Sequence, residues 1–271
     1  MRRPDFITAE EAVDRIKSGT TICTIGMTLV SACEAILKVL EKRFLETGKP
    51  NQLTYVHTCG QSDCIAGGAY RMAHEGMTKR VIGGYWGLCP NMMELIYQNK
   101  IEAYNLPQGQ MANMFHSMAL REPGKISKIG LGTFIDPRIE GGKMNSRTKC
   151  LEDIIDVVNI DGEEYLRYKE IPIDTLLIRG TYADEEGNIS AEEEAMVLEV
   201  LPAVMAAKRF GGQIICQVKK VLKTDTISPK NVIVPGVLID AVVVCENPLE
   251  EHRQSSSWYY DPAYSGQAVT C

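Results

Sequence analysis

The sequence predicts an α/β fold, an open three-layer αβα domain with a mostly parallel central sheet. Short β-branched segments alternate with helical segments along most of the chain, a pattern typical of parallel strands joined by crossover helices. One interruption of this alternation, at Asp161-Gly162, predicts a β-hairpin insertion, because glycine accepts the positive φ of a primed turn.

The expected elements follow in order along the chain. Thr8 and Glu11 have the spacing of a capping box, so the first helix begins there and ends at Gly19. In the first half we expect strands at 20–25, 53–57, 80–82 and 101–104, and helices at 31–45, 92–99 and 111–120. After a hairpin at 157–168, we expect a strand at 174–179, a helix at 192–209 and strands at 213–218 and 237–244.

Composition and charge narrow the class of protein. The 271 residues are 45% hydrophobic and 24% charged, which is enough apolar sequence for a substantial core. The net charge of −6 argues against nucleic-acid or anionic-membrane partners, since both require a basic face. No signal peptide or membrane-spanning run is apparent. Nine scattered cysteines, an odd number, favour reduced thiols in a cytoplasmic protein over a disulfide framework.

Glycine-rich loops follow several of the predicted strands. In parallel sheets, ligands bind beyond the carboxyl ends of the strands, where exposed amides can bind a phosphate or an oxyanion. Three such loops span 25–28, 83–90 and 104–110, and a fourth, longer segment spans 130–145. Tight turns alone would also explain the glycines. The Walker A, G-x-G-x-x-G, G-x-S-x-G and H-E-x-x-H signatures are absent.

The fourth segment carries a family resemblance. Its sequence GLGTFIDPRIEGGKMN resembles the signature of family I coenzyme A transferases, within the propionate/acetate CoA-transferase group. Pro107-Gln108-Gly109 is similar to the family's P-Q-G loop, and residues 181–188 are similar to its AD..GN turn. Residues 211–218 and 235–244 also match, so the similarity extends in register from about residue 6 to residue 266.

The resemblance implies an enzyme of the EC 2.8.3 type, which moves CoA between a short-chain acyl-CoA and a carboxylic acid. In this family a glutamate carboxylate attacks the thioester, giving an acyl-glutamyl anhydride and then a glutamyl-CoA thioester. Such a weak nucleophile needs a carbonyl polarised by preorganised donors, together with binding energy from the CoA tail. No cofactor is expected, because CoA is itself the substrate.

The resemblance also implies that the nucleophile lies outside this chain. The family carries its glutamate on a second unit, and this sequence corresponds to the first, or alpha, unit. Residues 1–250 are expected to form the alpha-type domain, and 251–271 resemble the linker between units in fused enzymes. Glu246-Asn247-Pro248 differs from the family's E-N-G motif in its proline and its position, so Glu246 is interpreted as a solvated loop acid.

Eight residues are expected to contact substrate or CoA: Gly26, Met27, Thr28, Pro107, Gln108, Gly109, Gly132 and Thr133. The strongest candidate is Gln108, whose amide could donate a hydrogen bond to the acyl oxygen or carboxylate. The first loop has one glycine where the family commonly has several. The bulky Met27 side chain would therefore narrow the space in which a substrate could approach the backbone of this loop. Tyr85 and Trp86 are expected at the acyl pocket or a subunit contact. Arg138 and Lys143 are interpreted as partners of the CoA phosphates or as ordinary solvated charges.

Other functions remain open at this stage. His57, Cys59 and Cys64 lack the spacing of a zinc site, so no metal is expected. A degenerate alpha unit would bind CoA, or stabilise a partner, without catalysis. A sugar-phosphate isomerase of related fold would need a base and a phosphate loop on this chain. The preferred hypothesis is a cytoplasmic hetero-oligomer with a beta subunit or C-terminal unit, acting on acyl-CoA and a carboxylic acid.

Overall fold

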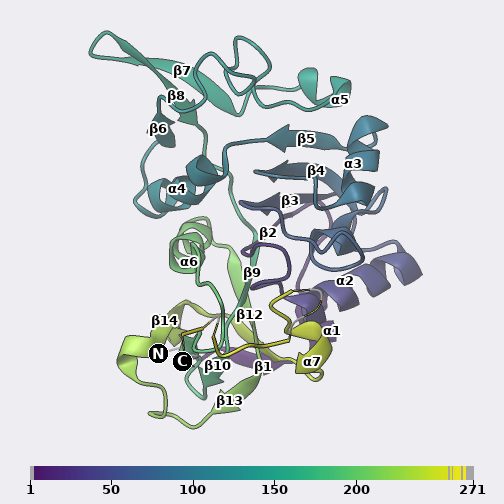
Figure 1. Ribbon diagram of the computed structural model, residues 1–271, viewed down its shortest axis with the longest axis vertical. Coiled ribbons are helices and arrows are strands. Elements are labelled where there is room, and N and C mark those ends of the chain that lie inside the picture. Colours follow the sequence, from purple (N-terminus) through teal and green to yellow (C-terminus); the bar gives the residue numbers. More distant parts are fainter. Residues whose placement is uncertain (1–2, 256, 258, 264, 267–271) are drawn as a thin grey trace.

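The computed structural model describes residues 3–255, 257, 259–263 and 265–266. At its centre is an eight-stranded sheet in which every neighbouring pair is parallel (Figure 1). In spatial order the strands are β1 (Asp5–Ile7), β15 (Ala241–Val244), β12 (Gln213–Val218), β9 (Thr175–Arg179), β2 (Thr21–Thr24), β3 (Leu53–His57), β4 (Thr78–Gly83) and β5 (Glu102–Asn105). The predicted parallel sheet is confirmed.

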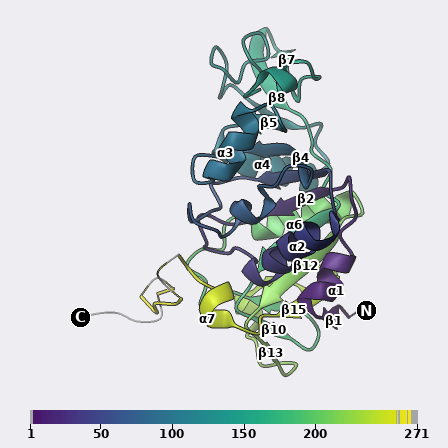
Figure 2. The same cartoon turned by 90° about the vertical axis from the view of Figure 1, so that its right-hand side faces the viewer.

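Two helical layers cover this sheet and complete the three-layer architecture. Helices α1 (Ala9–Asp14), α2 (Glu34–Thr47) and α3 (Pro90–Tyr97) pack on one face, towards the viewer in Figure 2. Helices α4 (Gln108–Ala119) and α6 (Val200–Arg209) pack on the other face. Burial on both faces explains why β9 is an apolar run, since every residue of that strand is buried.

The local signals at the first helix and at the hairpin are confirmed. The Thr8 hydroxyl accepts the Glu11 amide at 3.1 Å, while the Thr8 amide donates to the Glu11 carboxylate at 2.9 Å. Strands β7 (Ile155–Ile160) and β8 (Glu163–Tyr168) pair antiparallel around Asp161 and Gly162, both at positive φ. The turn has the left-handed geometry that its sequence predicts.

Two smaller sheets flank the central one. The hairpin joins β6 (Lys125–Ser127) to form an arm beyond β5, seen at the top of Figure 1. The other small sheet was not predicted, and its strands are β13 (Lys220–Leu222), β10 (Tyr182–Asp184), β11 (Ile189–Ser190) and β14 (Val232–Val234). The remaining elements are single turns: α5 (Ser146–Lys149), α7 (Pro248–Glu251), η1 (Ala69–Met72), η2 (Pro229–Asn231) and η3 (Gly236–Leu238).

Several predicted boundaries are wrong. The first helix ends at Asp14 and not at Gly19, and the helix expected at 111–120 begins at Gln108. The helix expected at 192–209 begins only at Val200, because Leu198 has a φ of 53° and segment 191–199 forms other contacts. The helix expected from residue 31 begins at Glu34, after Ser31 at a φ of 59°. The strand expected at 237–244 begins at Ala241, after the η3 turn.

The cysteines that the structure describes are all unpaired, as expected. Cys23, Cys33, Cys89, Cys216 and Cys245 are buried, and burial raises the pKa of each of these thiols. Cys64 and Cys150 are exposed, so these two thiols do not pack in the core. Among the described residues, no helix combines the length and hydrophobicity needed to cross a bilayer.

Candidate functional site

Four loops meet at one edge of the sheet. Strands β2, β3, β4 and β5 are consecutive neighbours and parallel, so the loops that follow them lie at the same carboxyl edge. These loops carry Gly26, Thr58, Gly84 and Gln108. The edge is where ligands bind in open parallel sheets.

The Pro107-Gln108-Gly109 segment lies directly against the loop after β4. The Leu106 amide donates to the Gly83 carbonyl at 2.9 Å. A Cβ at Gly84 would lie 2.3 Å from Gln108 Cγ and 2.2 Å from the Thr58 carbonyl oxygen. Glycine at position 84 is therefore required for the loops after β3, β4 and β5 to approach one another.

Helix α4 begins at Gln108 and presents the first-turn amides at this edge. Pro107 precedes the helix with φ −61° and ψ 124°, and its carbonyl accepts the amides of Gln110 and Met111. The Gln108 and Gly109 amides precede these first hydrogen bonds of the helix, and the helix dipole favours negative charge there. A Cβ at Gly109 would meet nothing within 4 Å, so this position opens onto free space.

The structure adds Thr58 and Glu199, which no sequence motif marks. The Thr58 hydroxyl donates a hydrogen bond to Glu199 Oε1, although the two residues are 141 positions apart. The Cys59 thiol lies 3.5 Å from Gln108 Oε1. Burial chiefly raises the pKa of Cys59, and the Glu199 charge adds to this effect. Glu199 is the N-cap residue of α6, and the position at which this helix begins brings the Glu199 carboxylate to the site.

In the first loop, two of the expected donors already bond within the chain. The Met27 amide donates to the Val30 carbonyl at 3.1 Å, and the Thr28 amide donates to the Gly60 carbonyl at 2.7 Å. A Cβ at Gly26 would lie 2.1 Å from Gln61 Nε2, so this glycine allows close packing against a buried glutamine. In this conformation the Met27 and Thr28 amides are not available to a substrate.

Gly132 and Thr133 lie in a loop with its own hydrogen-bond network. The Gly132 amide donates to Asp136 Oδ2 at 3.0 Å, and the Thr133 hydroxyl donates to the Gly130 carbonyl at 2.8 Å. Further along, the Gly142 carbonyl accepts the Asn105 amide at 2.8 Å, which fastens this segment to the edge of β5. The fourth segment therefore reaches the end of β5 through Gly142, whereas Gly132 and Thr133 bond within their own loop.

The two cations of this segment are paired within the chain. Arg138 bonds Asp136 at 2.8 Å and Glu164 at 2.9 Å, and it holds the pKa of Asp136 well below its usual range. Lys143 is nearly buried and lies 2.7 Å from Asp153. The interpretation as an ordinary solvated charge is wrong for Lys143, which is buried, whereas Arg138 is half exposed and fits it.

Tyr85 and Trp86 separate in the structure. Trp86 is buried, donates its indole N–H to the Tyr104 carbonyl at 3.1 Å and packs edge-on against His57 at 4.3 Å. It is a core residue, so the expectation of a pocket or subunit role is wrong for Trp86. Tyr85 is about half exposed beside Gly60, at the same edge as Gln108.

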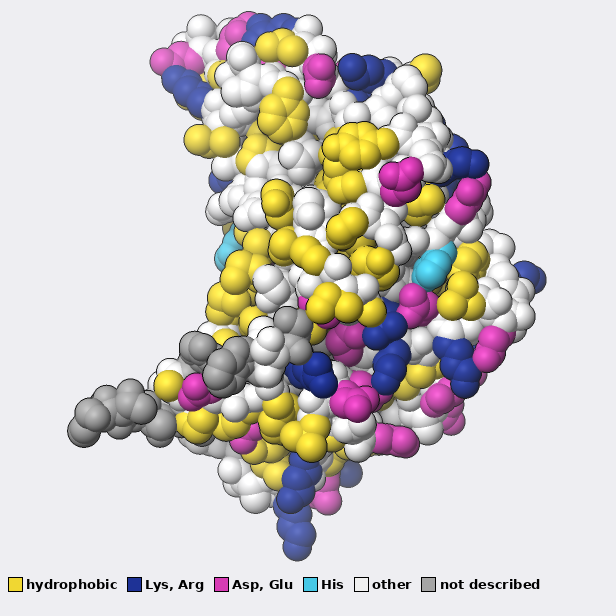
Figure 3. All heavy atoms as spheres, turned by 45° about the vertical axis from the view of Figure 1, so that its right-hand side comes forward, with side chains coloured by type: hydrophobic (Ala, Val, Ile, Leu, Met, Phe, Trp, Pro, Cys, Tyr) yellow, Lys and Arg dark blue, Asp and Glu magenta, His cyan; other side chains and the backbone are white. Residues whose placement is uncertain are grey.

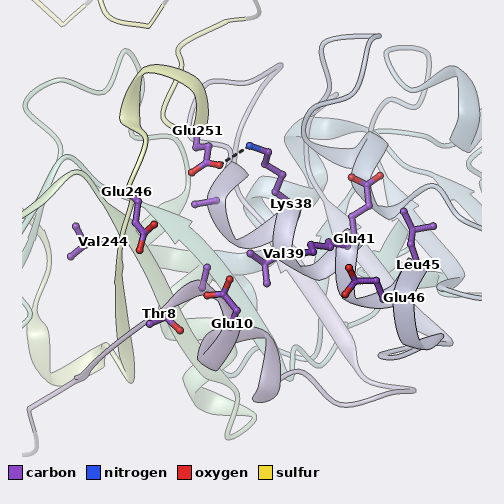
Figure 4. A pocket seen from close by; sticks show the side chains of 13 residues that line it. Thr8, Glu10, Lys38, Val39, Glu41, Leu45, Glu46, Val244, Glu246 and Glu251 are labelled. Atoms are coloured by element: carbon purple, nitrogen blue, oxygen red, sulfur yellow. Dashed lines mark hydrogen bonds and ion pairs between the residues drawn. The ribbon is translucent and has the colours of Figure 1, made fainter.

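A cavity of about 600 Å³ lies elsewhere, between α1, α2 and the end of β15 (Figure 4). Its lining includes Glu246 and the Lys38–Glu251 ion pair of 2.7 Å. Six strand spacings separate β15 from β5, so Glu246 lies about 29 Å along the sheet from the Gln108 loop. Glu246 is exposed, in agreement with its interpretation as a loop acid. No cluster of potential metal ligands occurs among the residues described.

Comparison with known proteins gives the family. Residues 6–245 match the family model described as Coenzyme A transferase, so the chain belongs to the coenzyme A transferase family. It is 39% identical over 261 residues to caffeate CoA-transferase of Acetobacterium woodii and 40% identical over 243 residues to acetate CoA-transferase YdiF of Escherichia coli K12. A solved structure of YdiF from E. coli O157:H7, a thioester complex with CoA, superimposes with a TM-score of 0.92 at 36% identity.

These relatives are about twice as long as this chain. The alignments cover 96% and 89% of the chain but 49% and 45% of the two curated relatives. The superposition covers 99% of the chain and 54% of the YdiF chain. The chain thus corresponds to about half of each relative. The match confirms the resemblance found in the sequence and favours a transferase over a sugar-phosphate isomerase.

Proposed function

We propose that this chain is the alpha unit of a CoA-transferase that moves CoA between a short-chain acyl-CoA and a carboxylic acid. The observation that carries the proposal is the position of Gln108, which begins α4 where three loops of the carboxyl edge meet. The second support is membership of the coenzyme A transferase family.

The chemistry assigned to this edge is polarisation of the acyl carbonyl. We assign the Gln108 side-chain amide and the backbone amides of Gln108 and Gly109, at the start of α4 beside open space, as the donors. A thioester carbonyl placed there gains negative charge when a carboxylate attacks it, and these donors stabilise that charge more than they stabilise the substrate. Gly26 forms part of the wall of the acyl site. CoA takes part as a substrate, released from one acyl group and attached to another.

The attacking glutamate is assigned to a second unit, a beta subunit or C-terminal unit. Half-length coverage of the relatives supports this assignment. Large exposed hydrophobic side chains also follow the strands at the carboxyl edge, including Met27, Ile65 and Tyr85, with Leu198 and Leu201 at the start of α6. Figure 3 shows exposed hydrophobic side chains gathered across the middle of one face. Such patches are typical of protein interfaces.

The domain boundaries remain part of this proposal: an alpha-type domain at 1–250, and a linker-like segment at 251–271 of which residues 256, 258, 264 and 267–271 lie outside the described residues. We place the complete enzyme in the cytoplasm, where its exposed thiols, Cys64 and Cys150, would stay reduced.

Purified chain, with and without its co-expressed second unit, tests the proposal when mixed with acetyl-CoA and propionate. We expect propionyl-CoA only when both units are present. Transfer by this chain alone would overturn the assignment of the nucleophile to the partner. No transfer by the assembled complex with any of a panel of short-chain acids would instead indicate a degenerate unit, and CoA binding measured by calorimetry would then identify its remaining role.

A further inference from the structure

A fully buried charged cluster lies behind the candidate site. Arg179, the last residue of β9, has 1% of its surface exposed, and its partners Glu194 and His252 are equally enclosed, at 5% and 0%. Burying charges is costly, and an apolar pair of similar volume is often as stable. Unlike an apolar pair, the charged side chains of this cluster form hydrogen bonds to the backbone of distant segments.

The Arg179 guanidinium connects three segments that are distant in sequence. Its Nη2 bonds Glu194 Oε2 at 2.6 Å, and its Nε lies 3.1 Å from the same oxygen. In the structure the first loop spans 25–33, between β2 and α2. Arg179 Nη1 donates to the carbonyls of Leu29 at 3.2 Å and Ala32 at 3.1 Å in this loop, and to the carbonyl of Arg253 at 2.9 Å in the C-terminal segment. One nitrogen therefore holds both the first loop and the segment after α7.

Glu194 and His252 extend this connection. His252 Nε2 lies 2.7 Å from Glu194 Oε1, and His252 Nδ1 lies 3.3 Å from Gln217 Nε2. Gln217 Oε1 accepts the Ala35 amide at 3.0 Å, in the first turn of α2, directly after the first loop. The C-terminal segment thus reaches the first loop by two routes, through Arg179 and through Gln217.

The first loop depends on such external contacts. Thr28 and Ser31 have φ values of 53° and 59°, left-handed conformations that residues with side chains rarely adopt. The Ser31 hydroxyl donates to the Met196 carbonyl at 3.2 Å, so segment 191–199 also holds this loop. The contacts of the Leu29 and Ala32 carbonyls with Arg179 therefore add to the bonds to Gly60 and Met196 that keep residues 28–32 in this strained turn.

We propose that Arg179 is a positioning residue of the candidate acyl site. It holds the first loop in the conformation that places Gly26 beside the site, and it couples that loop to residues 251–254, so loosening one segment loosens the other. The assignment of a catalytic consequence rests on the proposed transferase function, whereas the coupling itself does not.

Backbone hydrogen exchange on the assembled two-unit protein tests the coupling without any activity measurement. In Arg179→Met, we expect faster exchange in both 27–33 and 251–255, with β12 and β15 still protected. The matched control is Arg209→Met, since Arg209 also bonds a carboxylate, on Glu170, and a carbonyl, on Met118, but contacts neither segment. In the control, both segments should exchange as in the parent protein.

A milder variant keeps the test decisive if Arg179→Met fails to fold. His252→Gln interrupts the contact of the C-terminal segment with Glu194 while leaving Arg179 in place. Faster exchange in both segments supports coupling, whereas a change confined to 251–255, or a uniform change over the whole chain, overturns it.

Activity gives the second readout. Arg179→Lys keeps the charge but loses the forked donors, and we expect kcat/KM for acyl-CoA to fall about 10- to 100-fold through misplacement of the loop. Unchanged kcat/KM alongside altered exchange would overturn the positioning role. A parent protein that shows coupling but no transfer at all would contradict the transferase function and leave the coupling standing.

Discussion

The hydroxyl of Thr58 donates a hydrogen bond to the carboxylate of Glu199 at the edge of the sheet where the Gln108 loop lies. Glu199 is therefore the carboxylate on this chain that most directly competes with an external glutamate for the role of nucleophile. Its position at the N-cap of α6 favours a structural role, because its side chain connects that helix to the loop after β3.

Replacing Glu199 by glutamine separates these roles. Glutamine keeps an oxygen that accepts the Thr58 hydroxyl, so we expect transfer by the assembled enzyme to fall no more than about tenfold. Loss of a true nucleophile removes orders of magnitude more, about 10⁶-fold in well-studied cases. Steady-state kinetics measure the difference, with the exposed loop acid Glu246→Gln as control. A loss of about 10⁴-fold or more in Glu199→Gln alone would assign the nucleophile to this chain.

Removing the Gln108 amide should slow the chemical step. A single preorganised oxyanion donor is typically worth about 10²–10³-fold in kcat, so Gln108→Ala should lower kcat by that amount with little change in KM. Gln98→Ala is the matched control, because Gln98 is a surface residue at the end of α3 that bonds Glu94. A Gln108→Ala enzyme with parental kcat would exclude this side chain as a transition-state donor.

The two glycines of the site should respond differently to alanine. A Cβ at Gly109 meets nothing within 4 Å, and alanine is favoured over glycine in helices, so Gly109→Ala should gain up to about 1 kcal/mol of stability. If acyl-CoA occupies that space, its KM should nevertheless rise. A Cβ at Gly84 collides with the Thr58 carbonyl oxygen at 2.2 Å, so Gly84→Ala should lower the melting temperature.

Chemical denaturation together with acyl-CoA titration checks this pair. A Gly109→Ala protein that is stable and binds acyl-CoA as tightly as the parent would place the substrate elsewhere. Parental stability in Gly84→Ala would show that the loops after β3 and β5 are less closely packed than the structure describes.

Stability should decrease on mild acidification. Burial lowers the pKa of His57 and His252 from 6.5 to about 4, so both are neutral when folded at pH 7. Between pH 6.5 and pH 4 the unfolded chain binds more protons than the folded chain, so stability rises with pH there and is lost as pH falls. Each histidine contributes a slope of up to about 1.4 kcal/mol per pH unit.

Urea unfolding at several pH values between 7 and 4.5 measures this slope. His252→Gln should remove one histidine's share of this slope. A parent protein with constant stability across this range would show that neither histidine is held neutral by burial.

Much of the architecture is predictable because local signals determine it. The capping box at Thr8 and Glu11, the Asp161-Gly162 turn and the apolar run of β9 each depend on neighbouring residues only, and each is confirmed. The helix start at Val200 was missed because long-range contacts decide it. Glu194 forms an ion pair with Arg179, and Glu199 accepts a hydrogen bond from Thr58. These contacts hold residues 191–199 in a non-helical conformation, although their composition favours a helix.

The site is predictable in part, for the same reason. The Pro107-Gln108-Gly109 motif is recognisable by itself and is expected in a loop after a strand. The structure places it at the carboxyl edge, where it begins α4 three residues before the expected helix. Thr58 and Glu199 carry no motif, and only the folded sheet brings them together. Trp86 is expected at a pocket because it is a large side chain in a glycine-rich loop. Gly83 instead allows its ring to pack inward, since a Cβ at Gly83 would lie 2.6 Å from Trp86 Cζ2.

The location of the covalent intermediate tests the central claim most directly. The assembled enzyme is incubated with acetyl-CoA, quenched, digested and analysed by mass spectrometry for a peptide that carries CoA as a glutamyl thioester. The proposed function predicts this adduct on a peptide of the second unit, with residues 1–271 unmodified. A CoA adduct on Glu199, Glu246 or any other glutamate of this chain would contradict it.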